Sequence, residues 1–151
     1  MSDPNLVETV KAAMKAAMKA RNKQRLGTIR LIQAEFKRIE VDERIELDDA
    51  RALVVLDKMV KQRKDSASQF RDAGHNELAE QEESEIAVLR EFLPSQLSAE
   101  EITRLVDAAI AAAGGSGMQA MGAVMAQLKP QLQGRADMGE VGRIVKARLA
   151  G

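Results

Sequence analysis

The chain has 151 residues, a formal net charge of zero and no cysteine, which excludes disulfides, thiol catalysis and metal centres with cysteine ligands. A single histidine leaves no His cluster for zinc, and the balanced charge does not by itself indicate a polyanionic partner. Helix-forming residues dominate and aromatic residues make up only 2%, so the composition predicts helices and few strands.

No apolar run approaches the ~20 residues that cross a bilayer. The N-terminal stretch MSDPNLVETV also lacks the apolar core of a signal peptide. These observations predict a cytoplasmic protein with no membrane partner.

The first predicted helix begins at Ser2 or Asp3, with Pro4 in its first turn, where the missing N–H costs nothing. Apolar residues repeat at helical spacing on one face, and lysines occupy the other face. A polar turn at 21–23 leads into a second helix. The predicted inward residues are Leu6, Val10, Ala13, Met14 and Ala17, then Leu26, Ile29, Ile32, Phe36 and Ile39.

Residues 40–49 are acidic and are predicted to form a loop, with Asp48 as the N-cap of a third helix that runs to about Ala73. Gly74 is expected to end that helix, and a fourth helix spans about 76–92. The predicted inward residues are Leu53, Leu56, Met59, Val60, Ala67 and Phe70, then Leu78, Ile86, Leu89 and Leu93.

Pro94 interrupts this pattern, and the stretch LPSQLSAEE (93–101) is the best domain boundary in the chain. Ser98 and Glu101 have the spacing of a capping box, and Leu97 and Ile102 that of the matching hydrophobic staple. A fifth helix therefore begins after Ser98 and ends near the glycine run at 114–117.

A sixth helix is predicted over 118–128, followed by a loop at 130–136 and a seventh helix capped by Asp137. The methionines in the sixth helix have core spacing. The predicted inward residues are Met118, Met121, Val124, Met125 and Leu128, then Met138, Val141, Ile144, Val145 and Leu149. The expected fold is all-α with two domains: about four helices in hairpins at 1–94, and three helices at 98–151.

Charge is segregated along the chain although its sum is zero. Residues 1–38 carry nine Lys/Arg and three Asp/Glu, whereas residues 72–91 carry one and seven. One interpretation is solvated helix faces and pairing between helices. The other is a phosphate-contacting face, although no aromatic residue is interleaved with it for base stacking. The cations of that face are Lys11, Lys15, Lys19, Arg21, Lys23 and Arg25.

Arg63 falls inside the apolar arc of the third helix, and Glu82 and Glu85 fall inside that of the fourth. An unpaired buried charge is costly, so we predict that Arg63 pairs with Glu82 or Glu85 across a helical hairpin. A catalytic carboxylate pair is the alternative, but neither a nucleophile nor a metal ligand accompanies it.

The sequence has no Walker-type loop, no dinucleotide fingerprint and no metal-spaced ligands. The run GGSG lacks a following Lys-Ser or Lys-Thr pair, so it is expected to be a turn. We therefore predict no catalytic residue, cofactor or metal.

The order of several short motifs resembles the YqeY family, also called GatB/YqeY domain-containing proteins. These motifs are KQRKDS (61–66), FRDAGHNELAEQEESEIAVLREFLP (70–94), QLSAEEI (96–102), MGAVM (121–125) and GRAD (134–137). Residues from about 98 to 149 are similar to the tail domain of GatB, the B subunit of the glutamine-dependent aspartyl/glutamyl-tRNA amidotransferase.

This resemblance implies an all-helical two-domain fold and a tRNA-related binding role. It also implies a label of carbon–nitrogen ligase with glutamine as amido-N-donor. The synthetic active site lies in a different GatB domain that has no counterpart here. A binding module without its own active site therefore agrees better with the residues.

The C-terminal RNA-contacting edge is predicted from cations that lie off the buried stripe, namely Lys129, Arg135, Arg143 and Lys146, with Lys11, Lys15 and Lys19 as a second candidate surface. Gly134 and Asp137 are assigned folding roles, a tight turn and an N-cap. The alternative function is a protein-interaction adaptor that docks on a translation-associated complex.

Overall fold

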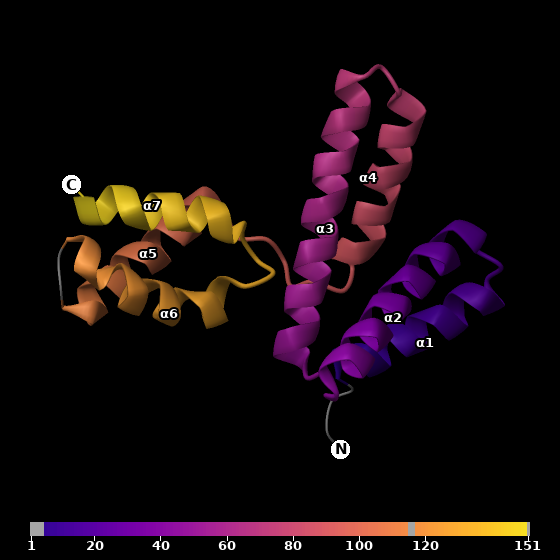
Figure 1. Ribbon diagram of the computed structural model, residues 1–151, viewed down its shortest axis with the longest axis horizontal. Helices are drawn as coiled ribbons and strands as arrows, with labels where there is room; N and C mark the ends of the chain where they lie inside the picture. The colour runs from indigo at the N-terminus through magenta and orange to yellow at the C-terminus, as the bar shows by residue number, and fades with distance from the viewer. Residues whose placement is uncertain (1–4, 115–116, 151) are drawn as a thin grey trace. The chain divides into compact units, whose positions relative to one another are not determined.

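The computed structural model describes residues 5–114 and 117–150. Over these residues it is helical, with α-helices joined by short turns and one 3-10 helix, η1, and it has no strand (Figure 1). The all-α prediction is therefore confirmed. The chain divides into two compact units, 1–93 and 94–151. That each unit is an independently folding domain stays a prediction.

The first unit consists of two antiparallel helical hairpins (Figure 1). Helices α1 (Leu6–Lys19) and α2 (Lys23–Glu43) form one hairpin, and α3 (Asp49–Asp72) and α4 (Asn76–Arg90) form the other. Their apolar stripes meet in one core, and α2 contacts both helices of the second hairpin. The fully buried side chains of this core include Val10, Ile29, Ile32, Leu56 and Leu89.

Side-chain caps fix where the helices of this unit begin. Asn5, Asn22 and Asp48 each accept a hydrogen bond from a backbone N–H in the first turn of α1, α2 and α3, which satisfies an otherwise unpaired donor. Asp48 is the predicted N-cap. Because Asn5 is the N-cap of α1, the prediction that this helix already includes Asn5 is wrong; Ser2, Asp3 and Pro4 lie outside the described residues.

The acidic segment 40–49 is only partly a loop. Helix α2 continues to Glu43 and ends at Arg44, which has the left-handed conformation, φ 55°. Arg38 pairs with Glu35 and Asp42 on the helix surface, and the Glu40 carboxylate accepts the Leu47 N–H at 3.1 Å. These local ion pairs and hydrogen bonds reduce the repulsion among the acidic side chains of the segment. Leu47, which was not predicted as a core residue, is 4% exposed.

The inward face of α4 matches the prediction at Ile86 and Leu89 but not at Leu78. Leu78 is 44% exposed, whereas Ala79 is fully buried. Ala67 on α3 is also buried. The prediction for Leu78 is wrong because small residues take the inward positions near the tip of this hairpin, where a leucine would keep the helices further apart.

The second unit is a three-helix bundle of α5 (Ala99–Ala113), α6 (Met121–Leu132) and α7 (Met138–Ala150), which contact one another pairwise. The predicted capping box is confirmed, because Ser98 and Glu101 exchange side-chain-to-backbone hydrogen bonds of 3.1 Å each. Leu97 and Ile102 both pack on the core of this unit. Asp137 accepts the N–H groups of Gly139 and Glu140, as expected of an N-cap.

Two predictions for the sixth helix are wrong. The helix does not end before Pro130 but continues to Leu132, which is fully buried. Burial of a leucine side chain stabilises by about 1.5–3 kcal/mol, which offsets much of the cost of a proline in the last turn. Met118 lies in η1 (Met118–Ala120) and is 47% exposed, because the tighter 3-10 turn changes the direction of its side chain.

Candidate functional site

The α1–α2 hairpin has a row of lysines along its surface. Lys11, Lys15 and Lys19 lie on successive turns of α1, and all three are exposed. Lys11 is 3.6 Å from Glu8 in a solvent-exposed pair, which adds little stability. Lys15 and Lys19 make no ion pair among the described residues.

The second helix of the hairpin adds a parallel row. Lys23, Arg30 and Lys37 are seven residues apart, so they share one face of α2. All three are exposed, and none has an ion-pair partner in the described chain. Arg25 differs, because its guanidinium pairs with Glu91, the C-cap of α4. Arg30 and Lys37 were not singled out in the sequence, although the spacing to Lys23 was a usable signal.

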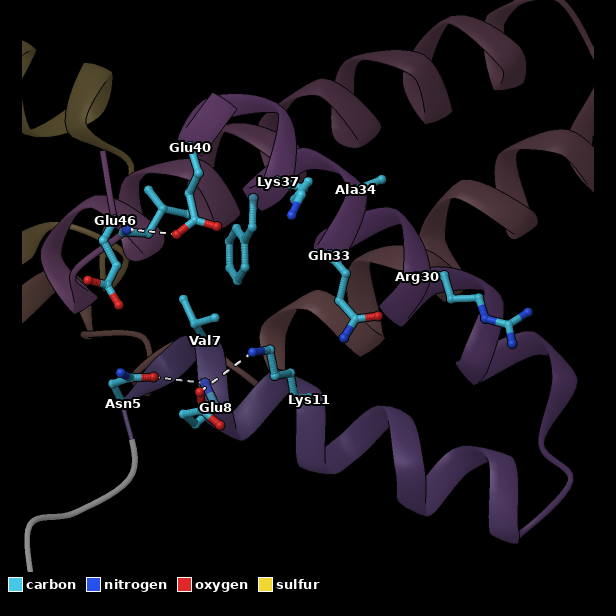
Figure 2. A pocket seen from close by; sticks show the side chains of 12 residues that line it. Asn5, Val7, Glu8, Lys11, Arg30, Gln33, Ala34, Lys37, Glu40 and Glu46 are labelled. Carbon is cyan, nitrogen blue, oxygen red and sulfur yellow. Dashed lines mark hydrogen bonds and ion pairs between the residues drawn. The ribbon is translucent and has the colours of Figure 1, made fainter. Parts of the chain in front are cut away.

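Lys11 of the first row, with Arg30 and Lys37 of the second, borders a groove between α1 and α2 (Figure 2). The groove encloses about 520 Å³, and the cations that line it are Lys11, Arg30 and Lys37. Val7, Ala34 and Phe36 supply apolar surface, and Gln33 supplies an amide that has no hydrogen-bond partner among the described residues.

Acidic residues line the groove where α1 begins. They are Glu8, Glu40 and Glu46. Glu8 pairs with Lys11, and Glu40 accepts the Leu47 N–H. Glu46 is exposed and makes neither a hydrogen bond nor an ion pair within the described residues. The groove therefore has a cationic stretch and, within the described residues, one carboxylate without a partner.

The predicted C-terminal edge is less available for a phosphate. Arg135 is half-buried, and its Nε donates to the Ser95 carbonyl at 3.3 Å. The Arg135 carbonyl in turn accepts the Leu97 N–H at 2.9 Å. Gly134 has φ +80° and its carbonyl accepts the Gln96 amide at 2.9 Å. The GRAD turn thus anchors the segment that leads into α5.

The other cations of that edge lie on α6 and α7. Arg143 forms an ion pair with Glu140 one turn earlier on α7. Lys129 and Lys146 are exposed, and neither has an ion-pair partner among the described residues. The C-terminal edge therefore has fewer cations without an ion-pair partner in the described chain than the α1–α2 hairpin has.

Arg63 and Glu85 lie together between α3 and α4. The Arg63 Nε is 3.3 Å from the Glu85 Oε2, and the two side chains are only 16% and 17% exposed. A second guanidinium nitrogen donates to the Met59 carbonyl at 3.2 Å. Glu82 makes no hydrogen bond in the described chain. Burial raises the pKa of Glu82, the nearby Glu85 carboxylate raises it further, and Arg63 lowers it.

The described residues contain no group of three or more His, Asp or Glu side chains that could hold a metal ion. No helix within 5–114 or 117–150 is long and apolar enough to cross a membrane.

Comparison with known proteins assigns the family. The family described as Yqey-like protein matches residues 7–149. This chain belongs to the YqeY family. The match runs through both units, so the sequence resemblance is confirmed at the level of the family.

Two curated relatives resemble the chain. An uncharacterized protein of Schizosaccharomyces pombe is 36% identical over 95 residues, which are 63% of this chain and 77% of that protein. A protein of Pyrenophora tritici-repentis named altered inheritance of mitochondria protein 41, mitochondrial, is 30% identical over 130 residues, 84% of this chain and 71% of that protein.

Proposed function

We propose that this YqeY-family protein binds tRNA through the α1–α2 hairpin, as a module without an active site of its own. The observation that carries the proposal is the double row of exposed cations without ion-pair partners in the described chain: Lys15, Lys19, Lys23, Arg30 and Lys37. Neutralisation of phosphates by such cations releases counterions and supplies most of the sequence-independent affinity for nucleic acid.

The zero net charge of the chain does not oppose this function, because the charges are segregated along the chain. The acidic residues of 72–91 lie mainly on α4, whereas the cations gather on α1 and α2. A local potential of one sign attracts a polyanion even when the total charge is zero. The resemblance to the GatB tail suggests tRNA as the nucleic acid, and we place the protein in the cytoplasm with it.

The test is binding of bulk tRNA to the full-length protein across a salt series. Affinity should fall steeply with salt, and a K15A/K19A variant should bind more weakly. Each phosphate contact contributes about 0.7–0.9 to the slope of log K against log salt. The variant, which removes two such contacts, should therefore lose up to about 1.4–1.8 from that slope.

The matched control is K61A/K64A. These two lysines are exposed on α3 of the same unit, outside the α1–α2 hairpin, and have no ion-pair partner among the described residues. K61A/K64A removes the same charge as K15A/K19A. It should change the salt slope by less than about half as much, since salt screens attraction between tRNA and charges outside the interface. Equal effects of the two variants would show that only total charge matters and would refute the hairpin interface.

A third variant, K129A/R143A/K146A, tests the C-terminal edge predicted from the sequence. We expect a smaller loss of affinity than for K15A/K19A, because Arg143 is already paired with Glu140. If the protein does not bind tRNA even at low salt, the RNA function is wrong. Partners captured after nuclease treatment at moderate salt would then support the protein-interaction adaptor.

A further inference from the structure

The centre of the α1–α2 groove offers different chemistry from its rims. Val7, Ala34 and Phe36 line it with apolar surface, and Gln33 extends from α2 into the space above α1 (Figure 2). Phe36 is 3% exposed, so its ring does not offer a face for stacking. The groove can therefore bury part of a flat, weakly polar group.

Polar groups that have no partner within the described chain lie on either side of this apolar centre. Arg30 and Lys37 are two turns apart on α2, about 10 Å along the helix axis. Beyond Lys37, Glu46 holds a carboxylate that accepts no hydrogen bond from the described residues. The other two groove carboxylates, those of Glu8 and Glu40, are engaged with Lys11 and Leu47.

A ligand that suits this arrangement carries an anion, a flat body and a hydrogen-bond donor, in that order. A nucleotide has all three. We propose that the groove holds an unpaired nucleotide of the RNA, with its phosphate at Lys37 and an amino group of its base donating to Glu46. This inference rests on the proposed function and deepens it, because it assigns the groove to a single-stranded part of the RNA.

The free carboxylate implies base preference. Cytosine, adenine and guanine each carry an exocyclic amino group that can donate to a carboxylate, whereas uracil carries no amino group and can donate only its ring N3–H. RNA bases are available for this kind of contact where they are unpaired, in loops and at ends. A duplex would satisfy the phosphate contacts of the hairpin but would leave Glu46 without a donor.

The experiment titrates the full-length protein with the four nucleoside 5′-monophosphates and with inorganic phosphate, monitored by two-dimensional NMR. CMP, AMP and GMP should bind about tenfold more tightly than UMP, within the usual range for a good base contact. An E46A variant should bind all four with similar affinity, close to that of UMP for the unaltered protein. A K37A variant should weaken binding of every nucleotide, UMP included.

Glu77→Ala is the control, because Glu77 is exposed on α4, lies outside the groove and has no ion-pair partner among the described residues. It should keep the preference over UMP. Equal affinity for all four nucleotides, or a preference that persists in E46A, would overturn the inference. So would the absence of nucleotide binding by a protein that still binds tRNA, and the tRNA interface would then stand alone. Failure to bind either ligand would remove both proposals.

Discussion

Replacement of Arg63 by alanine should destabilise the first unit by about 2–3 kcal/mol. The substitution leaves Glu85 without its ionic partner and beside Glu82, between two packed helices. Removal of one partner from a fully buried pair costs about 3–5 kcal/mol, whereas an exposed pair contributes about 0–1 kcal/mol. Side-chain exposures of 16% and 17% place this pair nearer the buried limit.

The measurement is urea unfolding followed by far-UV circular dichroism, since the chain has neither Trp nor Tyr as a fluorescent probe. With a slope of about 1.5 kcal/mol per molar urea, the midpoint of the affected transition should fall by about 1.3–2 M at pH 7. Lys61→Ala is the control, because Lys61 is exposed on the same helix and should change the midpoint little.

The deficit of R63A should shrink as the pH is lowered from 7 toward 4, because protonation of a carboxyl removes the uncompensated negative charge. The double variant R63M/E85Q should recover much of the lost stability, as expected when both charges of a buried pair are removed. An R63A variant within 0.5 kcal/mol of the unaltered protein at pH 7 would refute this reasoning, because the pair would then contribute no more than an exposed one.

Three further substitutions test other parts of the fold. Leu132→Ala should destabilise the second unit by about 3 kcal/mol, since Leu132 is fully buried beyond Pro130; a urea transition that does not move would show that α6 does not depend on this anchor. Ser98→Ala should cost about 1 kcal/mol through the lost N-cap, and thermal unfolding that matches the unaltered protein would contradict the capping box. Glu82→Gln should be neutral near pH 4 and stabilising at pH 7. The pKa of Glu82 is raised in the folded protein, so the protonated carboxyl contributes stability at low pH, and this stability is lost as the pH rises through the folded-state pKa. Glutamine stays uncharged and does not lose it. Melting temperatures of E82Q and of the unaltered protein between pH 4 and pH 7 check the last prediction. A variant that is more stable than the unaltered protein at pH 4 but not at pH 7 would contradict it.

The sequence by itself determined the helices and most of their inward faces. Periodic apolar residues such as Val10, Ile32 and Leu56 are buried as predicted, because the 3.6-residue period needs no tertiary information. Asp48, Ser98 and Asp137 are caps at the predicted positions, since a cap is made within one turn. The order of short motifs also identified the family.

The tertiary structure alone decided which charges are free. Arg25, Arg143 and Arg135 look as available in the sequence as Lys15 does, but the first two form ion pairs and the third binds the Ser95 carbonyl. Such pairing depends on side chains that are distant in the sequence or on rotamers that a helical wheel does not specify. The groove between α1 and α2 exists only once the two helices pack, and the unpaired cations of that hairpin are the reason that we propose it as the interface in place of the C-terminal edge.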